Sequence, residues 1–208
     1  MPHLYTMSTA ILPSQKNHSV VQIALFASGA GSNAKKIIEH FENSGRVVIK
    51  LVVCNKPGAG VVQIAADNNI PVLMIERERF FNGDSYLNEL NLASIEFIVL
   101  AGFLWKIPET LIQNFRNRII NIHPALLPKF GGKGMYGSKV HEAVIAAGEV
   151  ESGITIHYVD EHYDNGDVIF QAKCSILPTD TAESLAEKIH KLEHENFARV
   201  IEECVSKL

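Results

Sequence analysis

Short apolar runs that alternate with helical patterns constrain the fold of this chain more than any other feature of its 208 residues. The runs are almost continuously hydrophobic, which is typical of strands buried on both faces of a parallel sheet. The alternation predicts an α/β, Rossmann-like fold, with a mostly parallel sheet flanked by helices. The predicted strands are residues 20–27, 47–54, 71–75, 95–101 and 118–122, and the predicted helices between them are a segment that ends at Gly45 and residues 60–68, 84–92 and 108–115.

The last third of the chain departs from this alternation. Residues 138–147 read as a helix, but residues 153–159 and 167–176 then read as two strands with no helix between them. Two strands joined directly pair most simply with each other, so we expect an antiparallel hairpin at the C-terminal edge of the sheet. Residues 181–205 predict a long amphipathic helix that closes the chain.

Composition indicates a globular protein with a core of its own. Hydrophobic residues make up 47% of the chain and charged residues 20%, and the net charge of −4 argues against a general nucleic-acid binder. The longest apolar runs are too short to span a membrane. We expect a flexible N-terminal arm at residues 1–19, which lacks the features of a signal peptide, and a single domain at residues 20–208.

The cysteines and one pair of histidines bear on redox compartment and metal binding. Cys54, Cys174 and Cys204 are far apart and form no CxxC pair, which favours a reducing cytoplasm over a disulfide framework or a zinc site. His190 and His194 have the i, i+4 spacing of a metal pair, but nothing else in the sequence completes such a site. We therefore predict no metal.

The segment SGAGSNA, at residues 28–34, follows the first predicted strand and opens the first helix. Its glycines let the backbone approach a ligand, and a helix N-terminus offers N–H groups to an anion. A dinucleotide site would also have an acidic residue at the end of the second strand, and residues 54–56 carry none. Two interpretations stay open: a phosphate site for a smaller ligand, with Ser32 and Asn33 as further donors, or a tight turn with Ser32 as helix cap.

Asn121 and His123 end the fifth predicted strand, before a loop rich in proline and glycine. Ligands of open α/β sheets bind at the carboxyl ends of strands, so this pair should meet the glycine turn and residues 102–107 at one edge. Residues i and i+2 of a strand point to the same face. An amide beside an imidazole suits charge stabilisation on a carbonyl oxygen and proton transfer near neutral pH. A pair that merely caps the strand is the alternative.

Asp164 is the acidic residue that we expect beside this pair. It lies in the turn between the last two strands. A carboxylate near His123 would raise the imidazole pKa and fix the orientation of the ring, or it could take a proton from an attacking amine. Position alone does not separate Asp164 from Asp160, Glu161 and Asp167, and Asp-Asn-Gly is also ordinary turn chemistry.

Two further features stay open from the sequence alone. His157 alternates with Ile154 and Ile156 and could face either the core or a site. Phe103 and Trp105 follow the fourth strand, and aromatic side chains at such positions more often pack in a core than stack on a ligand.

Five segments in combination resemble the phosphoribosylglycinamide formyltransferases, the folate-dependent family of purine synthesis. They are SGAGSN, LAGFLWKI, NIHPALLPKFGGKGMYG, HYVDEHYDNGDVIFQ and KLEHENF, in the family's order and spacing from about Val20 to the C-terminus. NIHPALLP alone is similar to the wider group that uses formyltetrahydrofolate. SGAGSN, FGGKGMYG and the late Glu193 narrow the resemblance to this family.

The resemblance implies that the amine of glycinamide ribonucleotide attacks the formyl carbon of 10-formyltetrahydrofolate, without a metal, and that tetrahydrofolate leaves. It implies that Asn121 holds the oxyanion, that His123 donates a proton and that Asp164 raises the imidazole pKa. The implied residues that bind the ribonucleotide are Gly31, Ser32, Asn33 and Glu193. The implied residues that bind the folate are Leu104, Trp105, Lys106, Ile107, Asn121, Asp160, Glu161 and Asp164.

Some positions depart from the pattern of the family. Gly83 and Trp105 stand where basic residues are common in the family, so the resemblance does not say how the folate tail is held. Asp167 follows Gly166 where the family often carries proline.

Other functions share parts of this pattern. The same catalytic core occurs in methionyl-tRNA formyltransferase, in formyltetrahydrofolate hydrolase and in enzymes that modify a nucleotide-sugar amine. The first two carry an additional domain, which we do not expect here. A non-catalytic nucleotide-binding module is the other class, but such a module has no need of an acid–base pair.

We expect a cytoplasmic enzyme of purine biosynthesis, monomeric or homodimeric, that acts on small molecules and binds neither nucleic acid nor a membrane.

Overall fold

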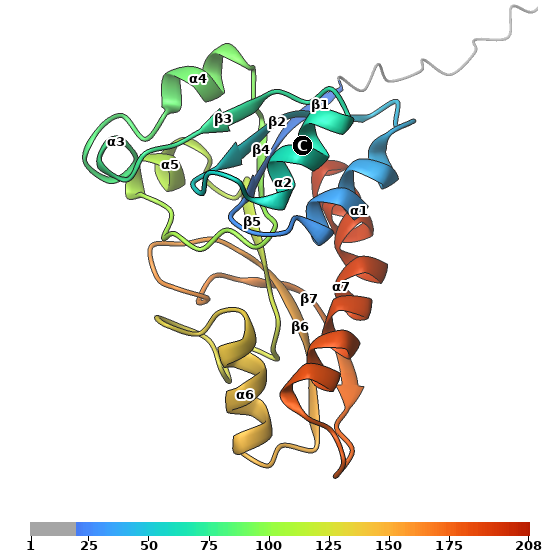
Figure 1. Cartoon of the computed structure of the whole chain (residues 1–208). Helices are drawn as coiled ribbons and strands as arrows, with labels where there is room; N and C mark the ends of the chain where they lie inside the picture. Colours follow the sequence, from blue (N-terminus) through green and yellow to red (C-terminus); the bar gives the residue numbers. More distant parts are fainter. Residues whose placement is uncertain (1–19) are drawn as a thin grey trace, which may run out of the picture.

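The centre of the molecule is a seven-stranded sheet, in the order β3-β2-β1-β4-β5-β6-β7 (Figure 1). The structure is a computed structural model that describes residues 20–208, so the arm predicted at residues 1–19 lies outside the described residues. The strands are β1 (Val21–Ala27), β2 (Val47–Cys54), β3 (Val72–Met74), β4 (Phe97–Leu100), β5 (Ile119–His123), β6 (Glu151–Tyr158) and β7 (Val168–Ser175).

The direction of the strands reverses twice across the sheet, at β6 and again at β7. Strands β1 to β5 pair in parallel, whereas β6 runs antiparallel to β5 and β7 runs antiparallel to β6. The predicted Rossmann-like α/β fold, with an antiparallel hairpin at its C-terminal edge, is therefore confirmed.

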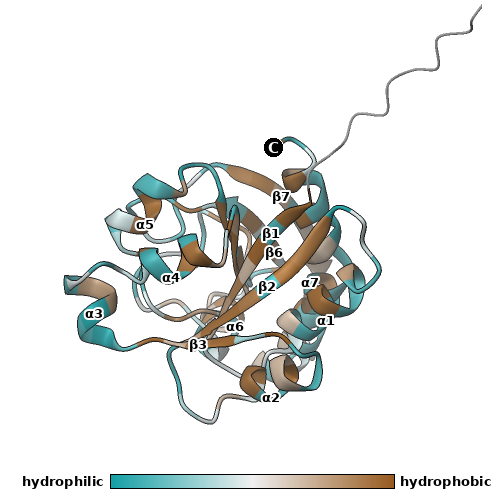
Figure 2. Ribbon diagram, turned by 90° about the horizontal axis from the view of Figure 1, so that it is seen from above, coloured by the Kyte–Doolittle hydropathy of each residue, from teal (hydrophilic) through white to brown (hydrophobic). Residues whose placement is uncertain are grey.

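Helices cover both faces of the sheet and form two separate buried clusters with it. One face carries α1 (Ser32–Phe41), α2 (Gly60–Asp67), α6 (Ser138–Ala146) and α7 (Ala182–Val205), and the other carries α3 (Arg77–Asn82), α4 (Leu87–Leu92) and α5 (Glu109–Asn114). Figure 2 shows the hydrophobic residues gathered in the strands and the hydrophilic ones on the outer helices and loops. None of the helices in residues 20–208 combines the length and the hydropathy that a membrane span requires.

Strand β1 shows why an almost continuous apolar run suits the centre of this sheet. Ile23 and Leu25 pack in the cluster that contains α1 and α7, and the alternate residues Ala24 and Phe26 pack in the cluster on the opposite face. All four are buried, because β2 and β4 flank β1 and helices cover both faces. Burying each large side chain contributes roughly 1.5–3 kcal/mol, so this strand holds the two layers together.

The segment between β3 and β4 differs from the prediction. Helix α3 is not predicted, and the helix predicted at residues 84–92 begins only at Leu87. Ser85 and Tyr86 have φ angles of 52° and 60°, which interrupt a right-handed helix. Tertiary contacts hold this segment instead: Phe80 is buried, and the Tyr86 hydroxyl accepts a hydrogen bond from the backbone N–H of Glu76 at 2.8 Å.

Candidate active site

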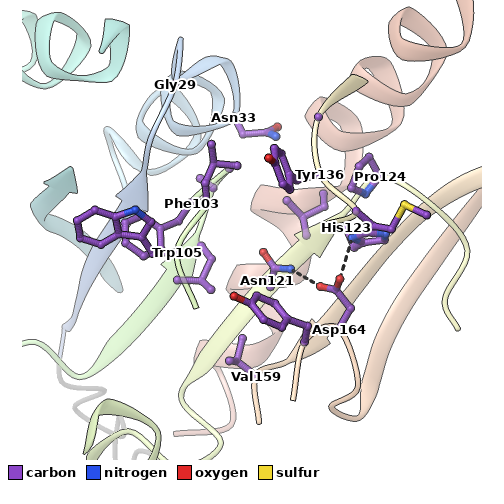
Figure 3. Close-up of a pocket in the computed structure, with 18 of the residues that line it drawn as sticks. Gly29, Asn33, Phe103, Trp105, Asn121, His123, Pro124, Tyr136, Val159 and Asp164 are labelled. Atoms are coloured by element: carbon purple, nitrogen blue, oxygen red, sulfur yellow. Dashed lines mark hydrogen bonds and ion pairs between the residues drawn. The ribbon is translucent and has the colours of Figure 1, made fainter. Parts of the chain in front are cut away.

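A cavity of about 450 Å³ opens where β1, β4 and β5 end. Its walls come from the glycine turn after β1, the segment after β4, the end of β5 with its loop, the connection between β6 and β7, and α7. Figure 3 shows side chains from several of these segments pointing toward a common space. Every site residue predicted from the sequence lines this cavity except Glu161, which is exposed in the β6–β7 connection and is not part of the wall.

The glycine turn places the start of α1 at the cavity. Gly31 occupies the N-cap position with a φ of 82°, and a Cβ there would lie 2.9 Å from the Cα of Val61. The turn therefore requires glycine, for both its φ angle and its lack of a side chain. Gly31 has no side chain to cap the helix, so the interpretation of Ser32 as helix cap is wrong. The first turn of α1 keeps N–H groups available to an anion.

Glu193 closes the same end of the cavity. The Asn33 Nδ2 donates a hydrogen bond to the Glu193 Oε2 at 3.0 Å, which joins α1 to α7. Helix α7 has a defined start, because Thr181 and Ser184 form a reciprocal capping box. Burial raises the pKa of Glu193, against the opposing effects of the Asn33 hydrogen bond and of nearby His190. This carboxyl is a buried acceptor that faces the ligand space.

Asn121 is held by residues on two other segments. Its Nδ2 lies 3.1 Å from the Nε2 of His157, which is its partner in the β5–β6 register, and 3.5 Å from the Oδ1 of Asp164. The His157 Nδ1 lies 2.8 Å from the backbone carbonyl of Tyr158. A carbonyl only accepts, so this contact places the His157 proton on Nδ1 and leaves Nε2 to accept from Asn121. One amide N–H is thus fixed, and the other makes only a long contact.

His123 is almost fully buried, with acceptors at both ring nitrogens. Its Nε2 lies 2.8 Å from the carbonyl of Phe130, and its Nδ1 lies 3.5 Å from the Oδ2 of Asp164 (Figure 3). Burial lowers the pKa of His123, while the Asp164 carboxylate and the Phe130 carbonyl act in the opposite direction. Because the Phe130 carbonyl fixes the ring, Nδ1 is the nitrogen that can exchange a proton beside the carboxylate.

Asp164 comes to this pair because the β6–β7 connection folds back over the end of β5. Its Oδ2 accepts a hydrogen bond from the Gly132 N–H at 2.9 Å, and its backbone is left-handed, with φ at 52°. Burial raises the pKa of Asp164, but the contact with His157, the charge of His123 and the Gly132 N–H together lower it below its ordinary value. Among the acidic residues of this turn, Asp164 is the one that contacts Asn121 and His123.

The segment after β4 forms the opposite wall. The Leu104 N–H donates to the Ser28 hydroxyl at 3.0 Å, which ties this segment to the glycine turn. Trp105 packs against Phe80, Phe81 and Phe103, so it belongs to an aromatic cluster as well as to the cavity wall. Lys106, Ile107 and Asp160 complete this side.

Four histidines of the cavity wall were not among the predicted site residues: His141, His157, His162 and His190. The sequence pattern allows His157 to face either the core or the site, and only the strand register shows that it lies opposite Asn121. His141 and His190 also line the cavity. The rings of His190 and His194 are stacked, with centroids 6.4 Å apart. Residues 20–208 contain no group of three or more His, Cys, Asp or Glu arranged to hold a metal ion.

Comparison with known proteins shows which protein family the chain belongs to. Residues 21–201 match the family described as formyl transferase. The chain belongs to that family.

This formyl transferase is similar to proteins named phosphoribosylglycinamide formyltransferase. It is 41% identical to the chloroplastic protein of Vigna unguiculata over 87% of this chain and 60% of the relative, and 38% identical to the protein of Bacillus subtilis (strain 168) over 88% and 93%. The crystal structure of the protein from Anaplasma phagocytophilum aligns with a TM-score of 0.82 at 32% identity, over 91% of this formyl transferase and 89% of that chain. The chain thus spans about 60% of the length of the plant relative and nearly all of the Bacillus one.

Proposed function

We propose that this protein transfers the formyl group of 10-formyltetrahydrofolate to the amine of glycinamide ribonucleotide, giving formylglycinamide ribonucleotide and tetrahydrofolate in purine biosynthesis. The observation that carries this proposal is the convergence of Asn121, His123 and Asp164 in one cavity whose other end offers a helix N-terminus and a buried carboxyl. The relatives that share the family carry the name of this activity.

The ribonucleotide occupies the end of the cavity near α1 and α7. Its phosphate binds the N–H groups of the first turn of α1, with Gly31, Ser32 and Asn33 around it, because the helix dipole and the free N–H groups favour an anion there. Glu193 accepts a hydrogen bond from the ribose or the glycinamide. The amine then reaches toward His123, which lines the same cavity.

The folate occupies the side formed by the segment after β4 and the β6–β7 connection. Leu104, Trp105, Lys106 and Ile107 form one wall for the pterin, and Asp160 and Asp164 form the other. Glu161 contributes through the backbone of the connection, since its side chain is exposed. This placement sets the formyl carbon beside Asn121 and His123.

The reaction needs one bond formed and one broken at the formyl carbon. The amine nitrogen attacks this carbon, and the carbonyl oxygen becomes an oxyanion that the second N–H of Asn121 stabilises. That N–H is available because its contact with Asp164 is 3.5 Å long. The amine loses a proton toward the Asp164 and His123 pair, and the folate nitrogen takes a proton from His123 as its bond to the formyl carbon breaks. Charge and protons balance without a further reactant.

An assay with both substrates tests the proposal. Purified protein is incubated with 10-formyltetrahydrofolate, with and without glycinamide ribonucleotide, and folate release is followed by absorbance. We expect release only when the ribonucleotide is present. Release without it would support a formyltetrahydrofolate hydrolase, and no release under any condition would support a nucleotide-binding module.

The remaining expectations belong to the same proposal. We propose a single formyltransferase domain at residues 20–208, a cytoplasmic location and a monomer or homodimer. The free cysteines fit a reducing compartment, since Cys54 and Cys204 are buried and Cys174 is half-buried. Size measurement of the full chain in solution would separate the monomer from the homodimer.

A further inference from the structure

His141 is a buried polar side chain that the reaction described above does not use. It lies on α6, is 4% exposed and lines the cavity. Its Nδ1 is shut off from solvent and has no hydrogen-bond partner among residues 20–208. A buried polar group without a partner destabilises a fold, so its presence on the wall of a cavity points to a ligand that supplies the partner.

The surroundings of the ring decide which of its nitrogens carries the proton. A neutral imidazole has one N–H donor and one acceptor nitrogen. A buried N–H without an acceptor costs more than a buried lone pair without a donor. The proton of His141 therefore belongs on Nε2, and Nδ1 keeps the lone pair. The side chain presents an N–H donor to the ligand space.

The charge state of the ring is consistent with a donor that stays neutral. Burial lowers the pKa of His141, and the nearby His190 and His123 lower it further, against a smaller opposing effect of Glu142. A lowered pKa favours the neutral ring, which has one N–H donor to offer a ligand.

The position of His141 indicates which ligand receives the hydrogen bond. Helix α6 lies beside α7, the helix that carries His190 and Glu193 (Figure 1). His141, His190 and Glu193 share the cavity with the start of α1. This is the end that the proposed function gives to the ribonucleotide. The acceptors of a ribonucleotide in this region are its phosphate and ribose oxygens.

We propose that the Nε2–H of His141 donates a hydrogen bond to a phosphate or ribose oxygen of the ribonucleotide substrate. This inference rests on the proposed function for the identity of the substrate. It makes His141 a binding residue whose Nε2–H gains an acceptor from the substrate, while the buried Nδ1 keeps its lone pair.

Two variants separate binding from structure. His141→Phe keeps the size of the ring but removes the donor, so we expect the KM for glycinamide ribonucleotide to rise about 10-fold while the KM for the folate stays the same. The same variant no longer buries an unpaired polar group, so the Tm of the free protein should rise by about 2–4 °C. His141→Gln restores an N–H donor and should recover much of the affinity.

Ser152→Ala is the matched control. The Ser152 hydroxyl is also buried without a hydrogen-bond partner among residues 20–208, but Ser152 does not line the cavity. We expect its removal to leave both KM values unchanged. If His141→Phe left the KM for the ribonucleotide unchanged, or if His141→Phe and His141→Gln lost affinity equally, the proposed hydrogen bond would not exist.

Nitrogen-15 NMR of the wild-type imidazoles tests the same contact without a variant or turnover. The Nε2 signal of His141 is followed while inorganic phosphate, ribose 5-phosphate or glycinamide ribonucleotide is added. A shift with all three ligands indicates a phosphate oxygen, and a shift only with the two sugar phosphates indicates a ribose oxygen. A shift with none of them overturns the inference, even if formyl transfer is observed. A shift with ribose 5-phosphate in a protein that fails to transfer the formyl group would overturn the proposed function alone.

Discussion

Asn121 and His157 face each other across the pair of strands β5 and β6, and the His157 Nε2 lies 3.1 Å from the Asn121 Nδ2. The contact exists because β6 is antiparallel to β5, which sets the two residues directly opposite. His157 is 2% exposed and its Nε2 faces Asn121 and Asp164, so we expect its effect on the reaction to pass mainly through the amide.

His157→Phe should therefore lower kcat by about 10-fold, with little change in either KM, because the amide loses the hydrogen bond that orients it. Steady-state kinetics with each substrate varied in turn gives the three constants. His157→Gln offers an acceptor oxygen and should retain more turnover than the phenylalanine variant. Equal losses in the two variants would mean that His157 acts through packing.

His123→Ala should reduce kcat by about 10²–10⁴-fold, the range of a missing general acid or base. Substrate binding should change much less, because the imidazole acts on the transition state rather than on the bound substrates. Isothermal titration with the ribonucleotide measures binding directly. Turnover that survived largely intact would remove His123 from the proposed chemistry.

Asp164→Asn should lower the pKa of His123 below its value in the wild-type protein. The carboxylate is the main influence that raises this pKa against burial, and an amide carries no charge. The variant keeps an oxygen that can accept from the Gly132 N–H, so the turn should stay folded. NMR titration of the imidazole measures the change, and an unaltered or higher pKa would contradict the coupling of the two residues.

Glu193→Gln should make the protein more stable near neutral pH and bind the ribonucleotide more weakly. Burial raises the pKa of this carboxyl above its ordinary value of 4.5. Below pH 4.5 the carboxyl is protonated in both the folded and the unfolded state, so it does not change the free energy of unfolding. As the pH rises through the folded-state pKa, the buried carboxyl must ionise, and the free energy of unfolding falls. The Tm of the variant should therefore exceed that of the wild-type protein at pH values above the folded-state pKa of Glu193, and the two Tm values should be equal below pH 4.5. Thermal unfolding at several pH values tests this, and a constant difference across the range would refute it.

Gly31→Ala should destabilise the protein more than Gly58→Ala. Both residues have left-handed backbones, with φ at 82° and 75°, so both variants carry the strain of about 1–2 kcal/mol for a side chain in this region. Only Gly31 has neighbours within reach of a new Cβ: the Cα and Cβ of Val61 at 2.9 Å. Overpacking of this kind adds about 1–3 kcal/mol. Denaturant unfolding of the two variants measures the difference.

The strand and helix pattern could be predicted because each buried strand is apolar at almost every position, as in β1 and β4. Helix α3 could not, since its residues are mostly polar and the segment is held by buried Phe80 and by the Tyr86 hydroxyl, which make contacts outside the helix itself. The pattern of polar and apolar residues along the chain does not show such contacts.

Part of the site was also visible in the sequence, because Asn121 and His123 lie two residues apart on a strand that ends at the ligand edge. The choice of Asp164 over its acidic neighbours needed the fold of the β6–β7 connection, which brings this residue within 3.5 Å of both. His157 and His141 depend on strand register and on the packing of α6, so spacing alone could not assign them.

The sheet also divides the apolar interior into two packing units that share no buried residue. Leu111 on α5 belongs to one unit and Ile189 on α7 to the other, and both are fully buried. Substitutions at residues without common neighbours have additive effects on the free energy of unfolding. Stabilising substitutions on one face of the sheet should therefore add to stabilising substitutions on the other. An engineer could thus strengthen the α3–α5 layer without disturbing the helices that frame the phosphate end of the cavity.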